Sequence, residues 1–163
     1  MDNMPLNVVI LGSIPESMLI IAFGLIMLGI KPIWRKIIVA AILQGIASYF
    51  IRRYISFGQH LLYLYITIII FTWLIVKIPL ITSMISSFIG MVINVLVEGL
   101  YSVIVLGLAN LSLVEVLSRS WLRLLVFTPK LLIMSGLLYL CRKHRFSLEK
   151  ELKAITKLNN TLK

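Results

Sequence analysis

The chain has 163 residues, of which 60% are hydrophobic and only 13% charged, whereas soluble domains average roughly 45–50% apolar and 25% charged residues. This composition excludes a water-soluble core. The formal net charge of +10 does not indicate a nucleic-acid partner, because the 16 Lys and Arg residues lie in short blocks between apolar runs and in the C-terminal tail, as in membrane proteins. We therefore expect an all-α integral membrane protein.

The first two apolar segments are separated by a basic turn. Ser13 and Glu16 have the spacing of a capping box, which predicts a first membrane span over residues 14–30 that Ser13 caps. Three cations and a tryptophan follow within residues 31–36, as is typical of a membrane interface. A second span is expected at about residues 37–51, before the basic pair Arg52-Arg53.

Residues 61–97 form the longest apolar run, and Lys77 is its one formal charge. A single helix of this length would extend roughly 55 Å, nearly twice the ~30 Å hydrocarbon core of a bilayer. Pro79 disfavours a continuous helix. The run therefore predicts two antiparallel spans, about residues 61–76 and 80–97, around which the rest of the chain is arranged. Beyond them, the fourth helix either continues or breaks at Gly99.

The C-terminal third of the chain is less uniform. Residues 111–123 mix apolar and charged side chains, which favours a helix lying in the interface. A fifth span is expected at about residues 124–140, with Lys130 inside it. Four or six spans are alternatives, because residues 100–111 are ambiguous. The chain thus divides into a transmembrane domain, residues 1–145, and a cytoplasmic helical tail, residues 146–163.

The distribution of cations predicts the orientation. With five spans and a cytoplasmic C-terminus, 11 Lys and Arg lie inside and four outside, with Lys130 within the membrane. The positive-inside rule then favours an N-terminus outside and a C-terminus inside. We expect a multi-pass protein of the cell membrane, such as the bacterial inner membrane. The four outer cations form a predicted outer rim: Arg52, Arg53, Arg119 and Arg123.

Three charged residues fall within the predicted spans, all toward the outer side. Glu16 lies at the start of the first span, Glu98 near the end of the fourth and Lys130 in the outer half of the fifth. Because charges in membrane spans are costly, they are usually paired or line a cavity. We predict a Glu98–Lys130 pair with Glu16 nearby, as a ligand-binding site or intramembrane ion pair. The alternatives are an ion pair that only fixes helix register, or side chains that extend to the lipid headgroups.

The tail carries apolar residues at heptad spacing with one polar position, a pattern that can fix the register of a coiled coil. This predicts a homodimer through the C-terminal helix, while an amphipathic helix on the membrane surface explains the same pattern equally well. The candidate coiled-coil residues are Leu148, Leu152, Ile155, Asn159 and Leu162.

No catalytic, metal or cofactor motif is evident. Cys141 and His144 could form a Cys/His pair, but both lie in a basic interfacial segment, where an inert thiol and a headgroup-facing histidine are expected. His60 has no partner at metal-ligand spacing. We therefore expect no enzymatic activity, no cofactor and no metal.

Several short segments together resemble the membrane sensor region of histidine kinases of Gram-positive spore formers, and are similar in layout to Agr-type quorum-sensing receptors and their small stand-alone relatives. These segments are residues 11–17 (LGSIPES), 29–32 (GIKP), 51–53 (IRR), 77–79 (KIP) and 97–98 (VE). The phosphoacceptor and ATP-binding regions of such kinases are missing. The resemblance therefore implies a protein that senses or scaffolds and does not phosphorylate.

Three functions follow as hypotheses. The first is a sensor or signal-transduction module that binds an external or membrane-dissolved ligand and relays it to the cytoplasmic helix. The second is a substrate-binding membrane subunit of a transporter, and the third is a structural assembly protein. The expected partners are the lipid bilayer, a second copy of the chain, and a kinase or an ATPase.

Overall fold

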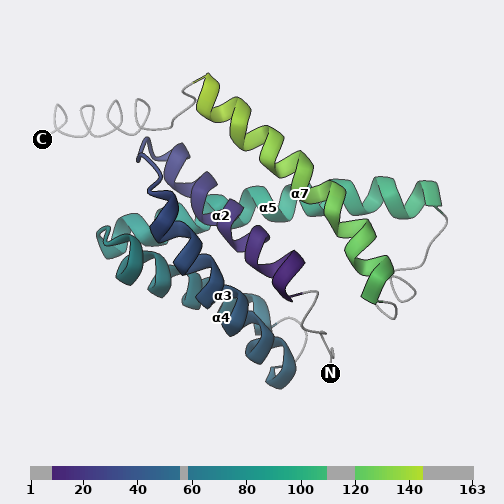
Figure 1. Cartoon of the computed structure of the whole chain (residues 1–163), viewed down its shortest axis with the longest axis horizontal. Coiled ribbons are helices and arrows are strands. Elements are labelled where there is room, and N and C mark those ends of the chain that lie inside the picture. Colours follow the sequence, from purple (N-terminus) through teal and green to yellow (C-terminus); the bar gives the residue numbers. More distant parts are fainter. Residues whose placement is uncertain (1–8, 56–58, 110–119, 145–163) are drawn as a thin grey trace, which may run out of the picture.

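The computed structural model describes residues 9–55, 59–109 and 120–144, and these contain helices and no strand. Two of the elements are short π-helical turns, η1 and η2, which are continuous with the α-helices beside them (Figure 1). The described part of the chain is therefore all-α, as predicted. The elements in chain order are η1 (Val9–Ser13), α2 (Ile14–Met27), α3 (Trp34–Tyr54), α4 (Gln59–Phe71), η2 (Thr72–Val76), α5 (Leu80–Ala109) and α7 (Ser120–Lys143).

Four helical stretches are long and apolar enough to cross a membrane: Ile10–Met27, Trp34–Tyr54, Gln59–Val76 and Leu80–Val105. α7 adds 24 residues with Lys130 near its middle, a length of about 36 Å at 1.5 Å per residue. The structure thus supplies four helices of membrane-spanning character and a fifth of sufficient length.

The centre of the bundle is α2. Eight consecutive residues, Leu19 to Ile26, are buried, which requires neighbours on every side of the helix. α2 packs against α3, α5 and α7, and Figure 1 shows it between α3 and α7. The expectation that the run 61–97 forms the centre is therefore wrong. α4 and α5 expose many large apolar side chains and therefore lie at the outside of the bundle. Most of α2 is apolar on every side, and Gly24 lets α5 approach it closely.

The predicted helix–turn–helix within residues 61–97 is confirmed. η2 ends at Val76, the following residue Lys77 adopts a left-handed conformation with φ 61°, and α5 begins at Leu80 directly after Pro79. Across the pair, the Ser83 hydroxyl donates a hydrogen bond of 2.8 Å to the Ile69 carbonyl. Of the two alternatives beyond residue 97, the structure shows the continuous one, because α5 runs unbroken through Gly99 to Ala109.

The prediction that Ser13 caps the first helix is wrong. Ser13 is itself helical, at φ −67° and ψ −34°, and its side chain makes no capping bond. The helical path begins earlier, in η1, and the Ser17 hydroxyl donates to the Ser13 carbonyl at 2.7 Å. The carboxylate of Glu16 is occupied elsewhere, so the reciprocal half of the capping box is also missing.

The first helix ends at Met27, three residues before the predicted end. Gly29 has φ 74°, and the Ile30 amide donates to the Leu25 carbonyl at 2.9 Å. This is the Schellman arrangement, in which a glycine adopts the left-handed conformation that other residues avoid. The same GIKP segment that suggested a family resemblance therefore acts locally as a helix stop.

Other boundaries differ from the predictions. α3 is longer at both ends than residues 37–51, and the fifth predicted span, 124–140, lies inside α7. Residues 120–123 were expected in an interfacial helix but form the first turn of α7, because no helix-breaking residue separates them from the apolar run. Residues 111–119 of that expected helix, and the tail 146–163, lie outside the described residues.

α2 and α5 cross at two glycines. A Cβ atom on Gly24 would collide with the Ser86 carbonyl, and one on Gly90 would collide with the Ile20 carbonyl. Small residues at a crossing let two helix backbones approach closely, which is a common basis of helix association in membranes. This contact fixes how α5 passes the central helix, and so where Asn94 and Glu98 lie.

Candidate functional site: a buried charged cluster

Lys130 is the most unusual side chain of the bundle, because a lysine on α7 is only 1% exposed. Its ammonium lies 2.5 Å from Oε1 of Glu16 and 2.9 Å from Oε2 of Glu98. The three residues come from α7, α2 and α5, whose separations in sequence are 114 and 32 residues. One cation therefore joins three helices.

Asn94 completes the cluster. Its amide nitrogen donates to Oε1 of Glu16 at 3.0 Å, so this oxygen accepts bonds from both Asn94 and Lys130. Asn94 is buried and lies four residues before Glu98 on α5, a spacing that places both on one helix face. The sequence analysis did not identify Asn94. The i, i+4 spacing to Glu98 is the signal that would have indicated it. We call Glu16, Asn94, Glu98 and Lys130 the charged cluster.

Local sequence helps to position these side chains. Glu16 lies in the first turn of α2, directly after Pro15 and next to the junction with η1. Pro129 lies inside α7, directly before Lys130. Since proline has no N–H, the carbonyl four residues earlier lacks its usual helical partner, which makes α7 more polar around Lys130.

The charges of the cluster compensate one another. An isolated ammonium buried in an apolar environment is very costly, and pairing with hydrogen bonds is what makes such burial tolerable. Arg52, at the end of α3, is close enough to act electrostatically on Glu16. Lys130 thus pairs with both carboxylates, and the half-buried Arg52 adds positive charge near Glu16.

Within the charged cluster, Lys130 is buried and Glu98 is the most exposed of the three charged side chains. The Glu98 side chain is 39% exposed and that of Glu16 is 23% exposed, against 1% for Lys130. A molecule approaching from outside the bundle would therefore meet the carboxylates first. What it could do there is compete for Lys130 or neutralise Glu98, and either would weaken the link between α7 and the other helices.

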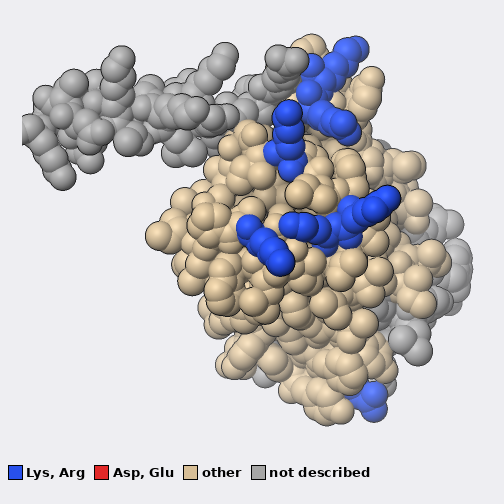
Figure 2. All heavy atoms as spheres, turned by 60° about the vertical axis from the view of Figure 1, so that its left-hand side comes forward, with Lys and Arg blue, Asp and Glu red and all other residues tan. Residues whose placement is uncertain are grey.

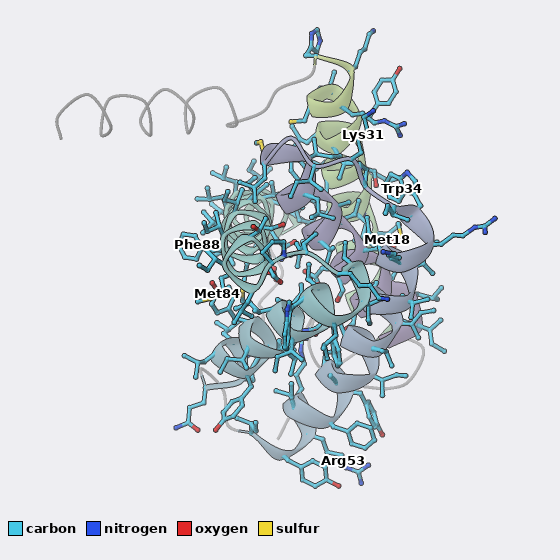
Figure 3. The ribbon with its side chains drawn as sticks, turned by 90° about the vertical axis from the view of Figure 1, so that its left-hand side faces the viewer. Met18, Lys31, Trp34, Arg53, Met84 and Phe88 are labelled. Atoms are coloured by element: carbon cyan, nitrogen blue, oxygen red, sulfur yellow. The ribbon has the colours of Figure 1, made fainter. Side chains whose placement is uncertain are left out.

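The depth of the cluster can be read along the helices. Glu16 precedes Met27, the last residue of α2, by 11 residues, and Lys130 precedes Arg142 by 12, which corresponds to about 16 Å and about 18 Å of helix. Figure 3 shows Lys31 and Trp34 toward one end of the bundle and Arg53 at the opposite end. The cluster therefore lies nearer the Arg53 end.

Comparison with protein-family models, curated protein sequences and solved structures gives no match. The resemblance to kinase sensor regions therefore stays a prediction.

The two described side chains of the predicted outer rim, Arg52 and Arg53, have different surroundings. Arg52 acts on the cluster, whereas Arg53 is exposed and makes local contacts, with its Nη1 3.4 Å from the Tyr49 hydroxyl and its guanidinium 5.9 Å from the centre of the Tyr54 ring. Arg119 and the side chain of Arg123 lie outside what the structure describes. The coiled-coil candidates of the tail lie outside it as well.

Within the described residues, no group of three or more His, Cys, Asp and Glu side chains could hold a metal ion. Cys141 is half-buried against the core of the bundle, and His144 is exposed at the end of α7. The charged cluster itself consists of one ammonium, two carboxylates and one amide, which can bind charged groups and which link three helices.

Proposed function

We propose that this chain is a non-catalytic membrane sensor module, which binds an external or membrane-dissolved ligand and relays it to its C-terminal cytoplasmic helix. The observation that carries the proposal is the burial of Lys130 between Glu16 and Glu98. Lys130 belongs to the helix that leads directly to residues 146–163. A ligand that disturbs the charged cluster therefore acts on the element nearest the cytoplasmic output.

The proposal includes five spans, with the N-terminus outside and the C-terminus inside. Four apolar helices support it, as does α7, whose length is sufficient and whose central charge is compensated. Lys36 and Lys77 support the orientation, because they lie at the same end of the bundle: the Lys36 ammonium donates to the carbonyl of Val76, the residue before Lys77, at 3.2 Å.

Orientation gives a direct prediction. In a Cys141→Ser background, the single substitutions Asn3→Cys and Ser112→Cys should react with a membrane-impermeant thiol reagent added to intact cells. Ser56→Cys should react too, because it follows the second span, whereas Asn160→Cys should react only after the cells are opened. Labelling of Asn160→Cys from outside intact cells would show that the orientation is wrong.

Ligand retention and co-purification distinguish the sensor from its rivals. The full chain is purified in mild detergent, and its bound small molecules and protein partners are identified by mass spectrometry. A sensor should retain a ligand that is lost in the Glu98→Gln variant. It should co-purify with a kinase or with no protein partner, and in neither case with an ATPase. Recovery of an ATPase complex would indicate a transporter subunit, and recovery of neither ligand nor partner would indicate a structural protein.

A further inference from the structure

A second surface of the bundle is strongly basic and is not used by the charged cluster. It is formed at one end by the turn between α2 and α3, the start of α3, the turn before α5 and the end of α7. We call it the basic end. Its described members are Lys31, Arg35, Lys36, Lys77, Arg142 and Lys143.

The apolar core brings these segments together. Ile30, Trp34, Ile78 and Cys141 are packed against one core cluster, and each is within one residue of a member of the basic end. The position of the cations is therefore a consequence of helix packing. Figure 2 shows blue side chains gathered over the upper part of one face, with no red side chain visible on that face.

No carboxylate neutralises this surface among the described residues. The two described acidic residues, Glu16 and Glu98, both bind Lys130, about 20 Å away along the helices. Lys36 is partly occupied, since its ammonium donates to the Val76 carbonyl. The remaining cations are exposed and available to an anionic partner.

Large apolar side chains continue directly from the basic end along the bundle. Ile38 and Val39 on α3, and Trp73 and Leu74 on η2, are exposed. A partner that matches both features has an anionic head and an apolar tail. We propose that the basic end binds the headgroups of anionic phospholipids, with their acyl chains along these faces. The inference rests on membrane insertion but not on sensing.

Fluorescence quenching tests this inference in the full chain. In a Trp73→Phe/Trp121→Phe background, Trp34 reports on the lipid beside the basic end. The protein is placed in phosphatidylcholine vesicles that contain equal fractions of either brominated phosphatidylcholine or brominated phosphatidylglycerol. We expect stronger quenching by the brominated phosphatidylglycerol. Equal quenching by the two lipids would overturn the inference, while quenching by either still demonstrates insertion.

Variants with neutralised cations test whether the basic end is the source of the preference for phosphatidylglycerol. Lys31→Gln/Arg35→Gln should reduce the preference for phosphatidylglycerol by about fivefold for each cation removed, and Arg53→Gln, at the opposite end, should leave it unchanged. Arg142→Gln/Lys143→Gln, at an exposed helix end, provides a second variant if the first misfolds. An unchanged preference for phosphatidylglycerol in both double variants would overturn the assignment of the lipid site to the basic end.

Discussion

Replacing Lys130 by methionine is expected to destabilise the bundle by roughly 3–5 kcal/mol, because removing one partner of a buried ion pair leaves the other charge uncompensated. Glu16 and Glu98 both lose their ammonium partner at once, while Glu16 keeps its hydrogen bond from the Asn94 amide. Since the Glu98 side chain is 39% exposed, water can solvate it in part, and the effect should fall in the lower half of this range. Reversible unfolding in detergent micelles with a denaturing surfactant measures the change.

The matched control is Lys143→Met, which removes the same group from the exposed end of the same helix. Its effect should stay within about 0.5 kcal/mol, as for most surface substitutions. Adding Glu16→Gln to Lys130→Met should recover part of the lost stability, because one buried charge is removed with its partner. Equal effects of Lys130→Met and Lys143→Met would show that the charged cluster does not stabilise the bundle.

The second large effect is expected at the crossing of α2 and α5. Gly24→Ala and Gly90→Ala should each destabilise by roughly 1–3 kcal/mol, the usual cost of overpacking. We expect values in the upper part of this range, because each new Cβ meets a backbone carbonyl, of Ser86 or Ile20, and not the movable end of a side chain. Unfolding in the same micelles provides the measurement.

Two other glycines provide the control. Around Gly99 and Gly136, a Cβ atom would find no heavy atom within 4 Å, so Gly99→Ala and Gly136→Ala should be neutral or stabilising by up to about 1 kcal/mol through helix propensity. If all four substitutions had the same effect, the close approach of α2 and α5 would not be a feature of the folded protein.

Local signals in the sequence were sufficient for the helices and for one turn. The break at Lys77 and Pro79 is confirmed because a long apolar run, a cation and a proline act within a few residues. The capping box failed for the opposite reason. Ser13 and Glu16 have the right spacing, but Glu16 binds Lys130, 114 residues away, and an ion pair with a buried ammonium is stronger than a capping bond.

The central position of α2 depends on packing that the sequence pattern does not specify. The run 61–97 is longer and equally apolar, yet α2 lies inside because Gly24 and Gly90 permit close contact with α5. The sequence also did not indicate whether the fourth helix breaks at Gly99 or continues through it. A glycine in an apolar run can mark a break or lie within a continuous helix, and the sequence pattern around Gly99 is compatible with both. The similar predicted depths of Glu98 and Lys130 in their spans did suggest that these two residues pair. Asn94 carries no charge, and its depth was therefore not considered.

We expect the charged cluster to hold α7 to the rest of the bundle, so that neutralising Glu98 moves the end of α7. Pulsed electron–electron distance measurements test it with spin labels on Arg35→Cys and Lys143→Cys in a Cys141→Ser background, in lipid nanodiscs. A second label pair, Arg35→Cys and Lys77→Cys, reports on a part of the bundle that the Lys36–Val76 hydrogen bond holds together. With Glu98→Gln added, the account predicts a shifted or broadened distance distribution for the Arg35–Lys143 pair and an unchanged one for the Arg35–Lys77 pair. Unchanged distributions for both pairs would contradict it.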